Sequence, residues 1–197
     1  MSASLLAEYE WIGRALAEEW KPMAGGTIEV TEPATGQPMG RVSRASAADV
    51  RASAAAARQA QGPWAQRPYG ERAQVFRKAA ALLDAHRAEY AEWIVRETGG
   101  IPPKAMFEID SVLHLCHEAA AMLTQPSGLV LPSQPGVSSI ARRVAHGVVG
   151  VISPFNFPFL LSSRAVLPAL AAGNAVVLKP DPRTPVSGGV LLAVLLQ

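Results

Sequence analysis

The clearest pattern of apolar and polar positions lies near the C-terminus. Residues 148–152 and 175–178 are short apolar runs rich in β-branched residues, which is typical of strands buried on both faces. Between them, leucines recur at helical spacing, with Pro158 suited to a first helical turn and Gly173 to a stop. Pro168 inside this helix would bend it, because proline removes a helical hydrogen bond. The pattern therefore predicts a strand–helix–strand unit with a kinked helix.

Upstream of this unit, the periodicity predicts helices and one surface hairpin. Apolar positions that include Trp11 and Leu16 favour a weakly amphipathic helix at the N-terminus. Ser46 with Asp49 resembles a capping box and precedes an alanine-rich stretch of high helix propensity. The expected elements are, in chain order, a helix within residues 1–24, a hairpin with strands at 27–31 and 40–43, and helices over 46–61, 71–97 and 102–122, the last with Phe107 and Val112 facing inward.

The segment before the first strand of the unit predicts a turn-rich connection with extended parts. Residues 129–131 predict a short apolar strand. Residues 138–144 alternate between apolar and polar residues, so one face of this segment is expected to be solvated or to bind a partner. A last helix over residues 190–196 is almost entirely apolar, and Thr184 or Ser187 could cap it. We expect its surface to need cover that the rest of the chain does not supply.

Composition places the chain among globular proteins, since 49% of its 197 residues are apolar and 17% are charged. A net charge of +2 without a basic run gives no reason to expect a nucleic-acid partner. Arg164, Pro168 and Lys179 interrupt the longest apolar region, which favours a buried core over a membrane span. A single cysteine and an N-terminus without a secretory signal lead us to expect a cytoplasmic protein.

Cys116 lies close to His114 and His117, so these residues are the first candidates for metal or redox chemistry. On a helix only the two histidines share a face, and structural zinc requires four ligands. A nucleophilic thiol requires a neighbouring base and access to substrate, whereas Cys116 lies mid-helix among apolar neighbours. A small buried side chain is the favoured interpretation of Cys116, and no metal site is predicted.

Asn156 and Lys179 are the second candidate pair. Asn156 lies in the loop 153–157, directly after the first predicted strand, and Lys179 ends the second. Parallel strands place both residues at one carboxyl edge, where open α/β sheets bind their ligands. Two donors at that edge suggest a ligand site, although an Asx-turn would also explain Asn156. The dinucleotide fingerprint G-x-G-x-x-G after a strand is absent from the sequence.

Four motifs, in this order along the chain, resemble the aldehyde dehydrogenase superfamily. They are P-A-T-G at residues 33–36, E-T-G at 97–99, P-F-N-F-P at 154–158 and A-L-A-A-G-N-A-V-V-L-K-P at 169–180. The resemblance runs from about Gly26 to the C-terminus and is most specific from Gly147 to Pro180. The run R-E-T-G-G-I-P-P-K and the later K-P-D-P-R-T-P are most similar to the branch that contains bacterial benzaldehyde dehydrogenases.

The resemblance implies that an aldehyde, here an aromatic one, is oxidised to a carboxylic acid with NAD or NADP. In the family a cysteine attacks the aldehyde carbonyl, hydride passes to the nicotinamide, and a glutamate activates the water that hydrolyses the thioester. Asn156 matches the asparagine whose amide helps to form the oxyanion hole, and Lys179 matches the lysine that binds the adenosine ribose. The other cofactor-binding positions implied by the resemblance are Ile152, Ser153, Pro154, Phe155 and Asp181.

Two departures from the family pattern change what is expected. The family often has an acid three residues after the lysine; here that position is Pro182, with Arg183 beside it. Without that carboxylate the repulsion of a 2′-phosphate is weaker, so we expect the site to accept NADP as well as NAD. The catalytic cysteine and glutamate of the family have no counterpart here, because Cys116 matches no position of the motif. The chain is therefore expected to be inactive alone.

The resemblance implies the α/β fold class, with a partial Rossmann-like NAD(P)-binding domain, an oligomerisation arm and no catalytic domain. We divide the chain into an N-terminal helical segment (1–25), a first part of the NAD(P)-binding domain (26–125), arm strands (126–146) and a βαβ part (147–197). The complete enzyme is expected to act on a small aldehyde as a homo-oligomer. Two competing hypotheses are a non-catalytic module that joins full-length subunits through the arm, and a metal- or redox-responsive helical protein that uses Cys116.

Overall fold

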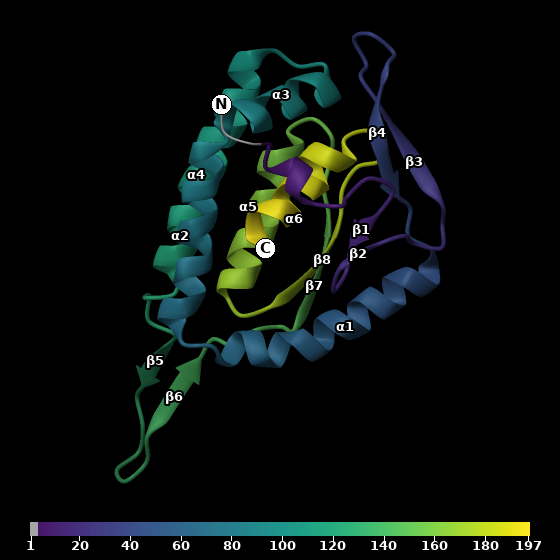
Figure 1. Cartoon of the computed structure of the whole chain (residues 1–197). Helices are drawn as coiled ribbons and strands as arrows, with labels where there is room; N and C mark the ends of the chain where they lie inside the picture. The colour runs from purple at the N-terminus through teal and green to yellow at the C-terminus, as the bar shows by residue number, and fades with distance from the viewer. Residues whose placement is uncertain (1–3) are drawn as a thin grey trace.

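The computed structural model describes residues 4–197 and has the α/β architecture expected from the sequence (Figure 1). The helices are α1 (Ala47–Gln66), α2 (Tyr69–Ala85), α3 (Arg87–Thr98), α4 (Pro102–Met122), α5 (Pro158–Ala171) and α6 (Leu191–Leu196), with a 3-10 turn at Leu6–Glu8 and a π-helical turn at Val186–Val190. The strands pair as β1 (Ala15–Leu16) with β2 (Trp20–Lys21), β3 (Thr27–Thr31) with β4 (Pro38–Ser43), β5 (Gly128–Leu131) with β6 (Ser139–Arg142) and β7 (Val148–Ile152) with β8 (Ala175–Lys179).

The predicted strand–helix–strand unit is confirmed. β7 and β8 run parallel in a register that places Ile152 opposite Lys179, and α5 connects them. Pro158 begins α5, and Gly173, with a φ of +86°, follows its end. Burial on both faces is wrong for both strands. Val151 is the one buried residue of β7, Ile152 is 81% exposed, and no residue of β8 is buried. The reason is that this sheet has two strands in the described part of the chain, so its side chains lack neighbouring strands.

Helix α1 holds the C-terminal end of α5 close to the sheet. The predicted capping box begins α1, since the Ser46 hydroxyl accepts the Asp49 N–H and the Asp49 carboxylate accepts the Ser46 N–H. The helix then runs past β7 and β8 (Figure 1). The Trp64 indole N–H donates to the Leu170 carbonyl oxygen at 2.8 Å. Because the last carbonyls of a helix have no partner within it, this contact caps α5 from outside.

The single helix predicted over residues 71–97 is wrong, because the structure divides it at His86. The backbone of His86 leaves the helical region, with φ of −114° and ψ of +22°, and ends α2 while it begins α3. Because the chain changes direction at this break, each helix can turn its own apolar face toward the core, and both Leu83 and Tyr90 are fully buried. Local periodicity cannot report such a break, because each half keeps its own apolar face. Gly99, with a φ of +67°, ends α3 close to the predicted end of the helix at residue 97.

Helix α4 begins and ends at the predicted residues, with two prolines in its first turn. Val112 is fully buried, as expected, and so is Cys116. Phe107 was expected to face inward, but 57% of it is exposed. Its ring instead lies edge-on to Phe157, with 6.1 Å between the centroids. The inward position beside it belongs to Glu108, which is fully buried.

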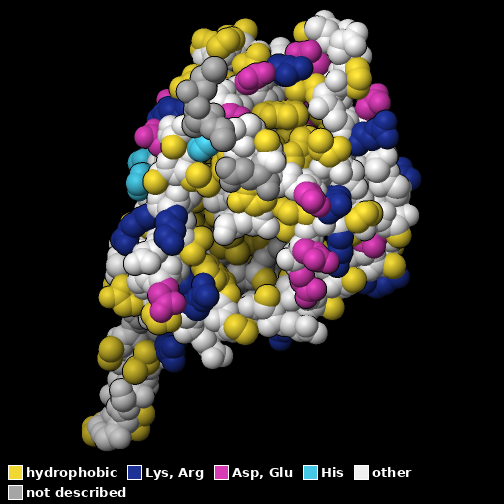
Figure 2. All heavy atoms as spheres, viewed as in Figure 1, with side chains coloured by type: hydrophobic (Ala, Val, Ile, Leu, Met, Phe, Trp, Pro, Cys, Tyr) yellow, Lys and Arg dark blue, Asp and Glu magenta, His cyan; other side chains and the backbone are white. Residues whose placement is uncertain are grey.

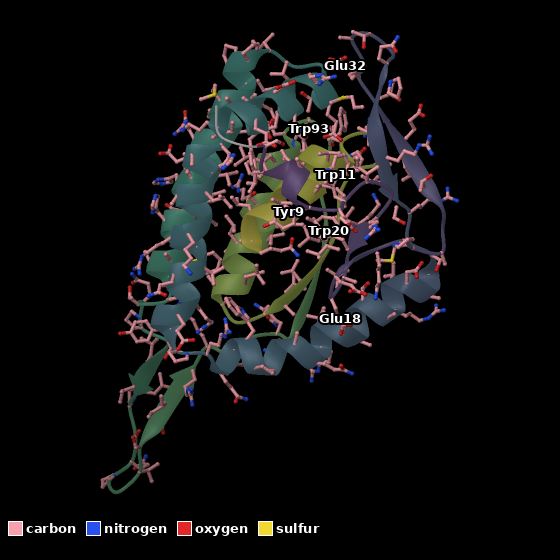
Figure 3. All side chains as sticks on the ribbon, in the orientation of Figure 1. Tyr9, Trp11, Glu18, Trp20, Glu32 and Trp93 are labelled. Atoms are coloured by element: carbon pink, nitrogen blue, oxygen red, sulfur yellow. The ribbon has the colours of Figure 1, made fainter. Side chains whose placement is uncertain are left out.

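The helix predicted at the N-terminus is wrong for the described residues 4–24, and its first three residues lie outside the described part. A 3-10 turn and the short β1–β2 hairpin form instead. The Glu89 carboxylate accepts the N–H groups of Leu5 at 2.8 Å and Leu6 at 3.0 Å and so holds the start of the 3-10 turn. Trp11 then reaches Trp93 of α3 in an edge-to-face contact of 5.6 Å (Figure 3). Contacts with α3 therefore override the local helical pattern.

The last helix is covered by the chain itself, so the expected lack of cover is wrong. Leu191, Leu192, Val194 and Leu195 are all buried. The Tyr90 hydroxyl also donates to the Leu191 carbonyl oxygen at 3.1 Å. Neither predicted side-chain cap forms. The fully apolar pattern of residues 190–196 thus indicates a helix enclosed by α2, α3 and α5.

Glu97 supplies the cap that local residues do not. Its buried carboxylate accepts the N–H groups of Val186 at 2.8 Å and Ser187 at 2.5 Å. These donors begin the helical segment that leads into α6, where unpaired N–H groups favour a negative charge. A carboxylate that lies 89 residues away in sequence therefore replaces Thr184 and Ser187 as the cap.

The predicted surface hairpin forms, and the two extended segments predicted after α4 pair as a second hairpin. β3 and β4 pair antiparallel at the surface, and β5 and β6 pair with Val130 opposite Ile140. The β5–β6 hairpin projects away from the rest of the molecule and carries apolar side chains along its length (Figures 1 and 2). Val130 is 80% exposed and Ile140 is 60% exposed. The hairpin therefore presents an unpartnered apolar surface.

Candidate functional site

The carboxyl ends of β7 and β8 meet at one edge of the sheet, as the sequence predicts. The Ser153 N–H donates to the Lys179 carbonyl oxygen at 3.1 Å, one residue beyond the paired strands. This bond fixes the start of the 153–157 loop beside the end of β8. The predicted site residues Ile152 and Lys179 are thereby brought together, and both are exposed.

The side chain of Ser153 points into the protein and not toward the exposed edge of the sheet. Its side chain is buried, with the hydroxyl 2.8 Å from the Ser162 hydroxyl of α5. Ser162 donates its one hydrogen to the Gly188 carbonyl oxygen at 2.6 Å, so Ser153 is the donor to Ser162. The chain of bonds ties the end of β7 to α5 and to the C-terminal helical turn. The hydroxyl of Ser153 is therefore already used inside the protein.

Arg183 joins two predicted site residues, Phe155 and Asp181. The guanidinium centre lies 3.5 Å from the centroid of the Phe155 ring. Its Nε and Nη2 donate to the two carboxylate oxygens of Asp181 at 2.8 and 3.0 Å. These hydrogen bonds lower the pKa of Asp181 to about 2. Arg183 thus holds the loop after β7 against the loop after β8.

Asn156 and Lys179 carry the polar groups that this edge leaves available. Asn156 is exposed, and within residues 4–197 its side chain has no hydrogen-bond partner, so the Asx-turn alternative is not observed. The Lys179 ammonium contacts the Pro180 carbonyl oxygen at 3.2 Å, which uses one of its three N–H groups. Both residues can therefore donate to a ligand.

Glu108 and Lys104 contact the end of the 153–157 loop and the start of α5, and sequence reasoning did not single them out. The Glu108 carboxylate accepts the N–H groups of Phe159 at 3.0 Å and Leu160 at 3.1 Å, in the first turn of α5. The Lys104 ammonium lies 2.6 Å from the other oxygen of Glu108 and 4.7 Å from the centroid of the Phe157 ring. The available signal was a glutamate on the apolar stripe of α4, which requires a buried partner.

Cys116 is not placed for nucleophilic chemistry. It is fully buried, and burial raises the pKa of its thiol to about 12, so the reactive thiolate is disfavoured. His114 lies on the exposed side of α4, 3.1 Å from Glu118. Within residues 4–197, no cluster of three metal-ligating side chains occurs. None of the helices in that part is long and apolar enough to cross a membrane.

A sequence model described as "Aldehyde dehydrogenase family" matches residues 20–197. The chain belongs to the aldehyde dehydrogenase family. It is 53% identical over 194 residues to a vanillin dehydrogenase of Amycolatopsis sp., covering 98% of this chain and 40% of that protein. It is 44% identical over 188 residues to benzaldehyde dehydrogenase [NAD(+)] of Pseudomonas putida, covering 95% of this chain and 39% of that one.

Solved structures of aldehyde dehydrogenases have the same fold. The crystal structure of an NAD-dependent benzaldehyde dehydrogenase from Corynebacterium glutamicum superposes with a TM-score of 0.88 at 40% identity, covering 93% of this chain and 40% of that one. The chain thus spans about 40% of the length of these relatives. The assignment to the family, the similarity to benzaldehyde dehydrogenases and the α/β fold class are confirmed.

Proposed function

We propose that this chain is the cofactor-binding part of an aldehyde dehydrogenase that oxidises an aromatic aldehyde to a carboxylic acid with NAD or NADP. Two kinds of evidence support the proposal. Relatives named for vanillin and benzaldehyde cover nearly the whole chain. The carboxyl edge of β7 and β8 also gathers the predicted site residues where an α/β sheet binds its ligand.

The residues at this edge suit a dinucleotide. Lys179 offers ammonium N–H groups to the hydroxyls of a ribose, and Asp181 next to it is held by Arg183. Exposed side chains of Ile152, Pro154 and Phe155 provide an apolar wall, while Ser153 fixes the strand end beneath them. When bound, the nicotinamide would accept the hydride of the aldehyde. These roles are proposals for the residues, and the fit of the donor set supports them.

Asn156 is proposed to donate its side-chain amide to the aldehyde oxygen. Attack on a carbonyl places negative charge on that oxygen, and a fixed N–H donor stabilises this charge by about 3 to 4 kcal/mol. An exposed amide that has no hydrogen-bond partner in the described part of the chain, on a loop fixed at both ends, suits that role. The 153–157 loop is tied to β8 through Ser153 and enters α5 at Pro158.

We further propose that the 197-residue chain does not turn over aldehydes alone. Cys116 is its one cysteine, and the buried, protonated thiol is not available for attack on a carbonyl. Aldehyde-dependent formation of NADH by the purified chain would contradict this part of the proposal. Cofactor binding does not require that thiol and can be measured separately.

Titration calorimetry with NAD, and in parallel with NADP, tests the site. We expect Lys179→Ala to weaken binding about tenfold, the effect of one lost hydrogen bond to a charged group. Lys78→Ala removes an exposed lysine of α2 and is the matched control. Equal affinities of the wild type and Lys179→Ala would contradict the proposed role of Lys179. Absence of binding by the wild type would contradict the cofactor site as a whole.

A second candidate role rests on the β5–β6 hairpin. Leu129, Val130 and Ile140 expose an apolar surface that extends away from the body of the molecule (Figure 2). Oligomerisation is a general feature of the family. The hairpin could join this chain to full-length subunits without catalysis. Co-purification with a full-length aldehyde dehydrogenase that is lost in Val130→Lys would favour this role.

A further inference from the structure

The start of α5 has no cap of its own. Its N-cap residue, Phe157, makes no side-chain hydrogen bond to the helix, and Pro158 has no N–H to offer. The first N–H groups that need a partner belong to Phe159 and Leu160. Phe159 is fully buried, so water cannot satisfy its N–H group. A partner must come from elsewhere in the protein.

Glu108 is that partner. One oxygen, Oε2, accepts both N–H groups, from Phe159 at 3.0 Å and from Leu160 at 3.1 Å. The other oxygen, Oε1, accepts from the Lys104 ammonium one helical turn earlier, at 2.6 Å. The Glu108 side chain has no exposed surface. A buried carboxylate at a helix N-terminus with a paired cation is fully satisfied and therefore holds its place.

The same pair reaches the loop that carries Asn156. The Lys104 ammonium lies over the ring of Phe157, 4.7 Å from its centroid, and Phe107 contacts that ring from the same helix. Phe157 is the residue directly after Asn156. Residues 157, 159 and 160 are thus all fixed to α4, while the exposed side chain of Asn156 makes no hydrogen bond to any residue from 4 to 197.

We propose that Glu108, anchored by Lys104, is the positioning residue of the 153–157 loop, and that it sets the place of Asn156 through the first turn of α5. The inference rests on the proposed function in that Asn156 is the donor to the aldehyde oxygen. Glu108 acts from the opposite side of the loop and touches neither substrate nor cofactor. Its contribution is to keep one backbone arrangement at the end of β7.

The geometry provides a discriminating pair of variants. Glu108→Gln can keep its carbonyl oxygen at the Oε2 position, where it still accepts both N–H groups, but its NH2 group then replaces the oxygen that accepted from Lys104, so only that bond is lost. Glu108→Leu has a similar size and removes every acceptor. Glu108→Asp keeps the charge but withdraws it by one methylene. Glu118→Leu, an exposed glutamate of the same helix, is the control.

Site-resolved amide hydrogen exchange measured by NMR tests the proposal on the 197-residue chain. We expect Glu108→Leu to raise the exchange rates of Phe159 and Leu160 at least tenfold, with Leu83 in α2 unchanged. Glu108→Gln should stay within about threefold of the wild type, since it keeps both bonds, and Glu118→Leu should match the wild type. If Glu108→Leu does not fold, Glu108→Asp should show the same local increase at Phe159 and Leu160.

Two results would overturn the inference. One is an equal rise of exchange in α2 and α5, which would make Glu108 a residue of general stability. The other is unchanged exchange at Phe159 and Leu160 in both Glu108→Leu and Glu108→Asp. NAD affinity measured on the same variants separates this inference from the proposed function. A wild type that binds neither NAD nor NADP would remove the proposed function, and the exchange data would still decide the role of Glu108.

Discussion

The guanidinium of Arg183 lies 3.5 Å from the ring centroid of Phe155, so the loops that follow β7 and β8 are in direct contact. A cation this close to an aromatic face is attracted by the ring quadrupole. Asp181 holds the other side of the guanidinium through two hydrogen bonds. Arg183 is therefore fixed at the edge where the cofactor is proposed to bind. We expect its positive charge to influence which cofactor the site accepts.

Pro182 stands between Asp181 and Arg183, so the substitution Pro182→Glu tests cofactor selection. We expect the wild type to bind NAD and NADP with affinities within a hundredfold of each other. Pro182→Glu should shift the ratio toward NAD by about tenfold or more, because a carboxylate repels the 2′-phosphate. Titration calorimetry with both cofactors measures the ratio. Pro182→Gln adds similar bulk without charge and should leave the ratio unchanged; an equal shift in both variants would contradict the electrostatic explanation.

Burial raises the pKa of the Glu97 carboxyl to about 7, although the bonds from Ser187 and Val186 act to lower it. The folded protein therefore binds this proton more tightly than the unfolded chain does. The contribution is fully present below about pH 4.5 and is lost as the pH rises toward 7. We expect the free energy of unfolding to fall by up to about 3 kcal/mol across this window. Urea unfolding at several pH values measures it.

The matched variant for this pH dependence is Glu97→Gln. Glutamine can accept at most one of the two N–H groups in the same way, so we expect the free energy of unfolding to fall by about 1 to 3 kcal/mol at pH 5. Because glutamine cannot titrate, the free energy of unfolding should then stay constant as the pH rises. Asp181 does not interfere, because Arg183 lowers its pKa to about 2 and its contribution changes only at more acidic pH. An identical slope in the wild type and Glu97→Gln would assign the pH dependence to another group.

The sequence predicted those parts of the fold that depend on local pattern. α4, the β7–α5–β8 unit and the capping box of α1 follow from apolar spacing and from prolines and glycines at element ends. The family motifs led to Asn156 and Lys179, and the structure places Lys179 beside the start of the loop that carries Asn156. In these places the residues that decide the structure are close neighbours in sequence.

The parts that could not be predicted depend on carboxylates that act over long separations; Glu97 and Glu108 are buried, and Glu89 is half-buried. Glu89 fixes the backbone of Leu5 and Leu6, Glu97 begins the C-terminal helical segment, and Glu108 begins α5. The separations range from 51 to 90 residues. Helical spacing shows that these glutamates share a face with apolar residues, and it does not show which N–H groups they meet. The prediction of an N-terminal helix was wrong for this reason. The prediction that the C-terminal helix lacks cover was wrong because α2, α3 and α5, which are distant in sequence, enclose it.

Trp11 tests whether the N-terminal segment is an integral part of the fold. It is 4% exposed and packs edge-on against Trp93, and the partly buried Tyr9 and Trp20 pack against the same core (Figure 3). We expect Trp11→Ala to lower the free energy of unfolding by about 3 to 5 kcal/mol, the usual cost of removing a buried tryptophan. Ile12→Ala is the control, since Ile12 is 66% exposed and should change stability by less than about 0.5 kcal/mol. Similar effects of the two substitutions would show that the segment does not pack as described.

Asn156 is expected to matter for chemistry and not for stability. Its side chain is exposed and, among the described residues, bonds to nothing, so Asn156→Ala should change the free energy of unfolding by less than about 0.5 kcal/mol. NAD affinity should also remain within about twofold, because the proposed contact of Asn156 is with the aldehyde oxygen. In any form of the protein that turns over an aldehyde, kcat should fall about 10² to 10³-fold, the effect of removing one oxyanion donor.

Asn174→Ala is the contrasting variant, because Asn174 is buried. Its side chain accepts the Gly147 N–H at 3.0 Å and donates to the Ala169 carbonyl oxygen at 2.9 Å. That variant should lose stability by about 1 to 3 kcal/mol, since it leaves buried backbone groups unpaired. A stability loss of the same size in Asn156→Ala would mean that this asparagine supports the loop, and the proposed oxyanion role would then lack its basis.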